Sequence, residues 1–470
     1  MNEQGRTVTA VILAAGLGTR MKSDRVKVLH PLLGRPMIIF PVALAKKSGA
    51  EKIVVVVGHQ ADAVRKSLAG LDLDYALQTE QLGTGHAIQQ AVPHLQETTG
   101  PVLILCGDVP LIKEETIREL LLHHEENGAA VTLLTTRVDL PAGYGRIVRS
   151  PSGNILKIVE EKDASDAERK IDEINTGIYC FDGTFLRTAV DSLTDRNAQQ
   201  EYYLTDLIEI ARMEQRRVGG VVCADPQEVM GINSRDQLAV AGAVLRDRIN
   251  LRHMREGVTL IDPTRTWIGL DVTIGRDTVI HPDCYLEGKT TVGEGTVIGP
   301  NTRIIDTAIG RNVEIRGFCH FIEARVEEGA ILGPFAHLRP GAKIGPSAHI
   351  GNFVEIKKSV IGEGSKVNHL SYIGDTGMGS GVNIGAGTIT CNYDGIFKHT
   401  TTIGDQVFVG SDTQFIAPVT IGDRSLIGAG STITRDVPED SLALSRVEQK
   451  IIRNGAKKIR ERLRKKKKAK

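Results

Sequence analysis

The sequence is poor in the features that mark secreted and membrane proteins. It holds six cysteines in 470 residues, and none lies in a CxxC pair, so neither a disulfide framework nor a zinc site is expected. No apolar run approaches the roughly 18 residues that a membrane span needs. The N-terminus lacks the charged start and the long apolar stretch of a signal peptide. These absences predict a cytoplasmic protein without a membrane span.

Aromatic residues and net charge are also scarce. Phe, Trp and Tyr make up 4% of the chain, so the core must be aliphatic. The formal net charge of +1 indicates no acidic partner. Residues 457–470 are an exception because they are dense in Lys and Arg. Such a tail can bind a nucleic acid or an anionic membrane, but a solvated, mobile tail is the prediction here.

Residues 1–233 alternate short apolar runs with segments of helical periodicity. Val8–Ala14, Lys52–Val57 and Val102–Cys106 are predicted to be buried strands. Strand and helix in repetition predict an α/β domain with a Rossmann-like, mostly parallel sheet, in which ligands bind beyond the carboxyl ends of the strands. Residues 234–256 are predicted to form a helical linker.

A different period governs residues 257–456. Aliphatic residues recur every six positions from Ile274 to Ile304, from Leu332 to Ile356 and from Ile403 to Ile433. A short fixed period of this kind is typical of a solenoid in which three short strands close each coil. The pattern resembles the hexapeptide-repeat family, which implies a left-handed parallel β-helix, here of about nine coils at the strand spacing of roughly 4.8 Å.

The repeat slips in places. The gap between Thr390 and Ile403 is 13 residues, where 12 would stay in phase. Extra loops and shifted registers interrupt a scaffold where function requires them, so we expect the irregular middle of the solenoid to be its working surface. The inward positions step by five residues at Ile304–Ile309, Phe321–Val326, Ile356–Ile361 and Ile373–Met378.

A glycine-rich turn follows the first predicted strand, from Leu13 to Met21. Its small residues let backbone N–H groups approach phosphate oxygens, and Arg20 and Lys27 can neutralise a triphosphate. The turn fits neither the Walker A pattern nor the dinucleotide fingerprint GxGxxG. Asp108 ends another strand, where a carboxylate can hold Mg²⁺.

These strings resemble the sugar-nucleotide pyrophosphorylase (nucleotidyltransferase) family over roughly the first 230 residues. The resemblance implies that Arg20 and Lys27 are catalytic, and that Asp108 and Asn233 hold Mg²⁺. A sugar 1-phosphate would attack UTP in line and release pyrophosphate without a covalent enzyme intermediate. The positions implied for the nucleotide and the sugar are Leu13, Ala14, Gly16, Gln78, Gly83, Thr84, Gly145, Glu160, Asn175 and Asn233.

Polar side chains gather in the irregular middle of the solenoid. Arg339 and Lys357 suit a phosphate, and His369 suits proton removal from an amine near neutral pH. With the strings NHLSYIGD and TCNYDG, the chain resembles, over nearly its whole length, a family of trimeric bifunctional uridyltransferase/N-acetyltransferases. The resemblance makes His369 the base. It places glucosamine 1-phosphate on Arg339, Lys357, Tyr372, Asn383, Asn392 and Tyr393, and acetyl-CoA on Ala386, Ser411, Ala429 and Arg446.

The function implied is synthesis of UDP-N-acetylglucosamine. Glucosamine 1-phosphate is acetylated by acetyl-CoA, and the resulting N-acetylglucosamine 1-phosphate then reacts with UTP in a homotrimer that binds no nucleic acid. One alternative is a pyrophosphorylase whose β-helix serves only assembly or regulation, and another is a non-catalytic regulatory protein. The cluster around His369 argues against the first, and the presence of Lys27 and Asp108 argues against the second.

Overall fold

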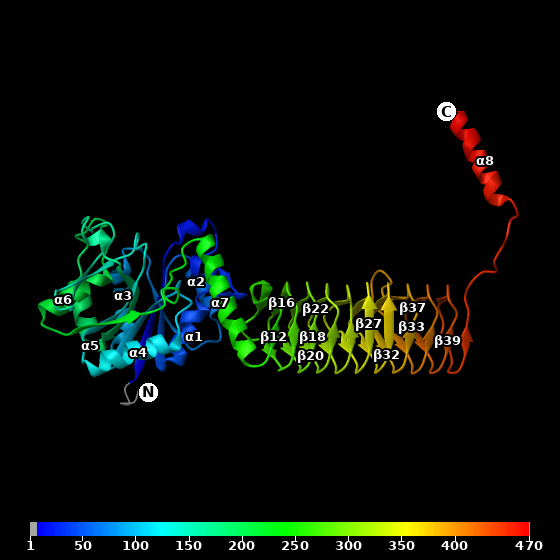
Figure 1. Cartoon of the computed structure of the whole chain (residues 1–470), viewed down its shortest axis with the longest axis horizontal. Helices are drawn as coiled ribbons and strands as arrows, with labels where there is room; N and C mark the ends of the chain where they lie inside the picture. The colour runs from blue at the N-terminus through cyan, green and yellow to red at the C-terminus, as the bar shows by residue number, and fades with distance from the viewer. Residues whose placement is uncertain (1–6, 470) are drawn as a thin grey trace. The chain divides into compact units, whose positions relative to one another are not determined.

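The computed structural model describes residues 7–469, which form two compact units, one ending at Arg248 and one beginning at Ile249. The division falls inside helix α7 (Arg235–Arg255), coloured green in Figure 1. The helix expected over residues 234–256 is therefore present, whereas the domain boundaries at 233 and 257 stay predictions. None of the helices within residues 7–469 is long and apolar enough to cross a membrane.

The first unit is built on a nine-stranded mixed sheet. Its main order is β11-β7-β10-β6-β1-β4-β5, and β8 and β9 form a hairpin beside β10. Strand β10 runs antiparallel to β6, β7 and β8, and β1 is parallel to β4 and β6. The strands are β1 (Val8–Ala14), β4 (Ala50–Val57), β5 (Asp74–Leu77), β6 (Pro101–Cys106), β7 (Val131–Arg137), β8 (Arg146–Arg149), β9 (Ile155–Val159), β10 (Glu173–Asp182) and β11 (Val218–Cys223).

Both faces of this sheet are covered by helices, as expected because its central strand β6 is apolar along its whole length. Alternate residues of β1 join different cores: Ala10 and Ile12 pack with α1, α2 and α4, and Val11 packs with α3, α5 and α6. The helices are α1 (Ile39–Lys47), α2 (Ala61–Ser67), α3 (Thr84–Ala91), α4 (Glu114–Glu126), α5 (Gly183–Ala189) and α6 (Leu207–Met213). A separate small hairpin pairs β2 (Pro31–Leu32) with β3 (Arg35–Pro36).

The second unit is a parallel β-helix, whose short strands lie in a row in Figure 1. Three parallel sheets of 11, 10 and 9 strands form its faces, so the predicted nine coils match the shortest face. The inward positions found from the period are buried, as Ile304, Leu332 and Ile427 illustrate with no exposed surface. Burial of these aliphatic side chains is what holds successive coils together.

The first face consists of β12 (Thr259–Leu260), β15 (Val279–Ile280), β18 (Val297–Ile298), β21 (Glu314–Ile315), β24 (Ile331–Leu332), β27 (His349–Asn352), β30 (Lys366–His369), β33 (Asn383–Ile384), β36 (Phe408–Val409), β39 (Leu426–Ile427) and β41 (Leu442–Ala443). The second face consists of β13 (Thr266–Ile268), β16 (Cys284–Glu287), β19 (Arg303–Ile305), β22 (His320–Ile322), β25 (His337–Leu338), β28 (Glu355–Lys357), β31 (Tyr372–Gly374), β34 (Ile389–Cys391), β37 (Gln414–Ile416) and β40 (Thr432–Ile433). The third face consists of β14 (Thr273–Ile274), β17 (Thr291–Val292), β20 (Ala308–Ile309), β23 (Arg325–Val326), β26 (Lys343–Ile344), β29 (Val360–Ile361), β32 (Thr376–Met378), β35 (Thr401–Ile403) and β38 (Val419–Ile421).

All four five-residue steps lie at one corner, between the second and third faces. There a residue in the left-handed region turns the chain sharply, with φ of 47° at Asp306 and 44° at Lys358. The next residue, Thr307 or Ser359, is buried, and its hydroxyl donates to the carbonyl oxygen two residues earlier. The steps are tight corners, and the corner at Ile304–Ile309 is several coils from His369. Two of the corners, at Ile356–Ile361 and Ile373–Met378, adjoin the predicted site residues Lys357 and Tyr372, so the link between the slips and a working surface stays a prediction. The 13-residue gap adds a loop, residues 392–400.

The basic tail contains helix α8 (Gly455–Lys468), where a solvated, mobile tail was predicted. Its described residues are exposed, apart from the half-buried Gly455.

Candidate active sites

A pocket of about 300 Å³ opens at the carboxyl ends of β1 and β6 in the first unit. The turn after β1 forms one side of it, and the segment that leads into α3 forms another. Glycine is required at Gly83, which has φ of 105° and where an added Cβ would lie 2.6 Å from the carbonyl oxygen of Tyr202. The predicted residues that line the pocket are Leu13, Ala14, Gly16, Lys27, Gln78, Gly83, Thr84 and Asp108.

Lys27 lies at the centre of the polar groups of this pocket. Its Nζ is 2.5 Å from Asp108 Oδ2 and donates to Asn233 Oδ1 at 2.9 Å. The backbone brings the two oxygens together, because the N–H of Ile232 donates to the carbonyl oxygen of Asp108. The side chains of Lys27 and Asp108 are only 13% and 20% exposed, so their attraction is weakly screened by solvent. Gly18 is positioned so closely that an added Cβ would lie 2.5 Å from the Lys27 Cβ.

The donor set at this point fits Mg²⁺. A carboxylate oxygen and an amide oxygen converge on one cationic position, and Mg²⁺ prefers a few hard protein oxygens, leaving its other sites to phosphate and water. Within the described chain there is no group of three or more His, Cys, Asp and Glu that would form a complete protein cage. Lys27 Nζ holds this position in the structure, so Asp108 and Asn233 are compatible with a substrate-completed metal site once the lysine side chain moves aside.

The predicted sugar positions form a second group beside the pocket. An added Cβ on Gly145 would lie 3.4 Å from both the Cβ of Asn175 and Oε1 of Glu160. The hydroxyl of Thr205 donates to Glu160 at 3.2 Å, and burial raises the pKa of the Glu160 carboxyl. Cys106, which lines the pocket, donates its thiol to the carbonyl oxygen of Gly177 near Asn175. These residues can accept hydrogen bonds from sugar hydroxyls and donate hydrogen bonds to them.

Arg20 is exposed on the short 3-10 helix η1 (Thr19–Met21), outside the lining of the pocket that the described residues form. Sequence reasoning also missed pocket residues. Glu201 is distant in sequence from the other lining residues and lies at the pocket because the N–H of Tyr202 donates to the carbonyl oxygen of Leu82. No local sequence pattern could have identified it. The residues that line the pocket without having been predicted are Ala15, Val28, Gln81, Ala87, Cys106 and Glu201.

In the second unit, His369 ends strand β30 and faces Asn352 of the neighbouring strand β27. The ring Nδ1 is 2.9 Å from Asn352 Oδ1. With the amide oxygen as acceptor, Nδ1 carries the proton and Nε2 keeps its lone pair, which a general base needs. Asn352 was not predicted, although it stands one coil before His369.

The predicted phosphate-binding cations lie on the second face, each with a carboxylate partner. Arg339 donates to Glu355 at 2.8 Å, and Lys357 Nζ is 3.8 Å from Asp375 Oδ2. Lys398, in the loop 392–400, adds a further cation, and its pKa is lowered chiefly by its contact with Lys357. None of these three partners was predicted.

Four further predicted residues surround this cluster. Tyr372 lies on β31, opposite Glu355 of β28. Asn392 is buried and donates to Asp375, whereas Tyr393 is exposed and its hydroxyl donates to the carbonyl oxygen of Gly395. Asn383 lies on β33 of the first face, opposite Lys366 of β30, the strand that ends at His369.

The positions predicted for acetyl-CoA form a column after the strands of the first face. Ala386, Ser411 and Ala429 each stand two residues beyond β33, β36 and β39. The N–H of Asp412 donates to the carbonyl oxygen of Ala386 at 2.7 Å, and Arg446 donates to that of Ala429 at 3.0 Å. Small side chains in such a column leave the backbone accessible to an extended ligand.

Known proteins resemble both units. The family model for nucleotidyl transferase matches residues 9–225, and the model for bacterial transferase hexapeptide (six repeats) matches residues 271–306, 323–358 and 400–435. The bifunctional protein GlmU of Trichlorobacter lovleyi is 54% identical over 94% of this chain and 96% of its own length. Those of Geotalea uraniireducens and Syntrophotalea carbinolica are 53% and 54% identical, over 94% and 95% of this chain and 97% and 96% of their own lengths.

Proposed function

The chain belongs to the family of bifunctional GlmU proteins, and we propose on that premise how its two units divide the synthesis of UDP-N-acetylglucosamine. The second unit acetylates glucosamine 1-phosphate with acetyl-CoA. The first unit couples the product to UMP from UTP and releases pyrophosphate. Two observations support this division: Lys27 stands between Asp108 and Asn233, and His369 is oriented by Asn352.

In uridylyl transfer, a phosphate oxygen of N-acetylglucosamine 1-phosphate attacks the α-phosphorus of UTP, and the bond to the β-phosphate oxygen breaks. Lys27 and Arg20 offset the negative charge of the transferring group. Asp108 and Asn233 would hold Mg²⁺, which supplies further positive charge to the phosphates when bound. The turn Leu13–Gly16 binds phosphate through its N–H groups.

The remaining predicted residues of the first unit bind the two ends of the substrates. Gln78, Gly83 and Thr84 contact the uracil. Gly145, Glu160 and Asn175 contact the sugar, and the buried Glu160 is supported as a hydrogen-bonding group by its contact with Thr205. No residue has to act as a base, because the attacking phosphate oxygen is already anionic.

In acetyl transfer, Nε2 of His369 takes a proton from the 2-amino group as the nitrogen attacks the thioester carbonyl carbon. The C–S bond breaks, and the leaving thiolate of CoA takes up a proton. Asn352 keeps the ring in the tautomer that this role needs. The sugar phosphate lies on Arg339, Lys357, Tyr372, Asn383, Asn392 and Tyr393, and acetyl-CoA lies on Ala386, Ser411, Ala429 and Arg446.

The enzyme acts as a homotrimer, which completes the acetyl-transfer site. An exposed apolar column on the second unit supports this proposal. Phe318, Phe335 and Phe353 stack at centroid distances of 5.0 and 4.9 Å, and Leu370 stands one coil further, directly after His369. These four side chains are 44–64% exposed, and a contiguous apolar patch of this kind marks an interface.

Phe335→Asp and Phe353→Asp are expected to break the trimer and to slow acetyl transfer by at least about tenfold, because each places a charge in an apolar interface. Uridylyl transfer should persist. Leu140→Asp, at an exposed site of the first unit, is the control. Light scattering with both assays checks this prediction. A trimer that survives both substitutions would contradict it.

All six cysteines lie among the described residues and are free thiols, two of them partly exposed. Unpaired cysteines suit a reducing compartment, where disulfides rarely persist, so we place the enzyme in the cytoplasm.

A one-pot reaction tests the proposed function as a whole. The purified chain receives glucosamine 1-phosphate, acetyl-CoA, UTP and Mg²⁺. Equal amounts of CoA, pyrophosphate and UDP-N-acetylglucosamine are expected, because each turnover of one unit feeds one of the other. Pyrophosphate formed from added N-acetylglucosamine 1-phosphate, with no CoA release, would instead favour the pyrophosphorylase with a non-catalytic β-helix.

A further inference from the structure

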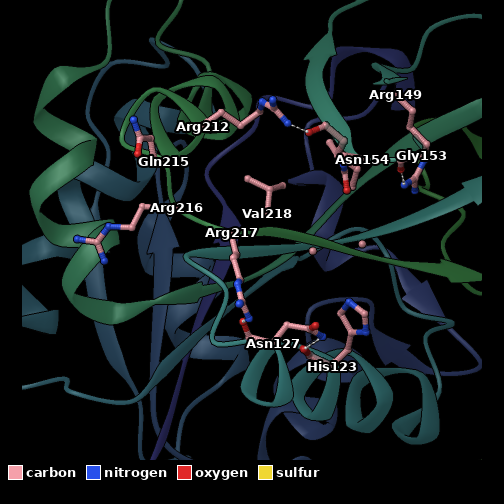
Figure 2. Close-up of a pocket in the computed structure, with 13 residues that line it drawn as sticks. His123, Asn127, Arg149, Gly153, Asn154, Arg212, Gln215, Arg216, Arg217 and Val218 are labelled. Carbon is pink, nitrogen blue, oxygen red and sulfur yellow. Dashed lines mark hydrogen bonds between the residues drawn. The ribbon is translucent and has the colours of Figure 1, made fainter. Parts of the chain in front are cut away.

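The first unit holds a second and larger pocket of about 650 Å³, which shares no lining residue with the nucleotide pocket. The end of α4, the turn between β8 and β9, α6 with the segment after it, and β11 form its walls. Figure 2 shows Arg149, Arg212 and Arg217 placed around Val218. The proposed reaction uses none of these residues. The lining consists of His123, Asn127, Arg149, Gly153, Asn154, Ile155, Arg212, Gln215, Arg216, Arg217, Val218, Gly219 and Gly220.

The lining carries positive charge only. Four of its members are arginines, and none of those that the structure describes there is Asp or Glu. Arg149 is neutralised by the buried Glu173, at 2.6 and 2.8 Å, and Arg216 lies 3.7 Å from Glu214. Glu173 and Glu214 therefore balance two of the four positive charges, and the charges of Arg212 and Arg217 remain in excess.

Arg212 and Arg217 are held by neutral partners. Arg212 donates to the carbonyl oxygen of Ile155 at 2.8 Å, and Arg217 donates to that of Asn127 at 3.1 Å. A carbonyl fixes a guanidinium without cancelling its charge, and each guanidinium has five N–H donors, most of which are left for a ligand. The two cations come from α6 and the segment after it, and they are oriented toward the β8–β9 turn and the end of α4 respectively.

We propose that this pocket binds a small anion carrying two or more phosphate groups. Guanidinium groups bind phosphate oxygens in pairs, and Asn127, Asn154 and Gln215 offer neutral donors beside them. The volume lies within the range of about 300–1,000 Å³ typical of small-molecule sites. No Phe, Tyr or Trp occurs among the described lining residues, so the large aromatic platform that favours a nucleobase or an RNA chain is missing. An inorganic polyphosphate or a multiply phosphorylated metabolite without a base is the chemical class that fits.

The pocket and the proposed sugar site share the β8–β9 hairpin. Its turn, with Gly153 and Asn154, lines the arginine pocket, whereas Gly145 precedes β8 and Glu160 follows β9. Arg212 supports the hairpin by donating a hydrogen bond to the carbonyl oxygen of Ile155. An anion that draws Arg212 away from this carbonyl changes the support of the hairpin, and so we infer that it alters the affinity for the sugar phosphate. This second step rests on the proposed function of the first unit.

Isothermal titration of the full chain with inorganic triphosphate, without Mg²⁺, tests the binding step. Arg216→Gln/Arg217→Gln should weaken this binding by about tenfold or more, because it removes two groups that donate charge-assisted hydrogen bonds to phosphate. Arg217→Lys, which keeps the charge but loses the paired N–H donors, should weaken the binding less than the double variant does. Lys27→Ala removes a cation from the nucleotide pocket and should leave the arginine site intact. Arg118→Gln removes an arginine of α4 outside the pocket and serves as the matched control.

Unchanged binding by the double variant, or loss of binding only with Lys27→Ala, would overturn the proposal. Equal melting temperatures show that the variants are folded. In competition, UTP should displace triphosphate from the nucleotide pocket but not from the arginine pocket. A single-stranded RNA oligomer that displaces triphosphate more effectively than pyrophosphate does would assign the pocket to nucleic acid instead.

Kinetics test the coupling step. At saturating UTP and fixed free Mg²⁺, triphosphate should change the KM for N-acetylglucosamine 1-phosphate at least twofold in the wild type. The same addition should have no effect in Arg216→Gln/Arg217→Gln. An unchanged KM in a wild-type protein that binds triphosphate overturns the coupling. Absence of uridylyl transfer from all variants refutes the proposed function instead, while the titration still decides the binding step.

Discussion

His369→Ala is expected to slow CoA release from acetyl-CoA and glucosamine 1-phosphate by about 100- to 10,000-fold, the usual contribution of a positioned general base. The substitution removes the imidazole Nε2, which is free to act as a base because Nδ1 is the ring nitrogen in contact with Asn352. Uridylyl transfer should be unaffected, because His369 lies in a different compact unit from the nucleotide pocket. A thiol-reactive dye that follows CoA, together with a pyrophosphate assay, measures both rates.

Asn352→Ala is the companion variant. Without the amide oxygen both tautomers of His369 become populated, so we expect a smaller loss than in His369→Ala, about tenfold, as for other residues that orient a functional imidazole. The pH profile of kcat should change, whereas the KM for acetyl-CoA should not. If His369→Ala keeps full acetyl transfer, the histidine is not the base.

Asp108→Ala is expected to slow Mg²⁺-dependent pyrophosphate formation by about 100- to 1,000-fold. This is the typical loss of rate when one charged or dipolar group that stabilises a transition state is removed. Asp108 is the carboxylate that fixes Lys27 and would hold Mg²⁺ with Asn233. Acetyl transfer should persist. Excess chelator should act in the same way on the wild-type protein, suppressing pyrophosphate formation and sparing CoA release.

The matched control for this site is Asp108→Asn, which keeps the shape and loses the charge. It should resemble Asp108→Ala in rate and the wild type in melting temperature. Loss of both activities in Asp108→Ala would indicate a folding defect. Full uridylyl transfer in Asp108→Asn would refute a role for the carboxylate.

Most of the fold could be predicted from the periodicity of the apolar residues. Buried inward positions such as Leu332 and Ile427 follow from the six-residue repeat alone, because each inward residue must meet its counterpart in the next coil. Strand β1 was predicted with its observed bounds, since an apolar run broken only by Thr9 and ended by small residues has few alternatives. The five-residue steps could not be recognised as tight corners from the sequence, because the left-handed turn at Asp306 and its buried Thr307 leave no trace in hydrophobicity.

The partners of the candidate site residues could not be predicted. Lys27 and Asn233 are separated by 206 residues, and only the folded sheet brings them together. The sequence did not identify Glu355 and Asp375 as partners of Arg339 and Lys357, because a carboxylate on a solenoid face is usually exposed to solvent. The arginine pocket is assembled from four separate segments and has no sequence motif at all.

The most direct test of two independent sites in one chain mixes the Asp108→Ala and His369→Ala variants. Each variant alone, supplied with glucosamine 1-phosphate, acetyl-CoA, UTP and Mg²⁺, should make almost no UDP-N-acetylglucosamine. An equimolar mixture should make it readily, because one variant supplies the acetylated sugar phosphate that the other consumes. A mixture as inactive as its components, although both variants are folded, would contradict the account.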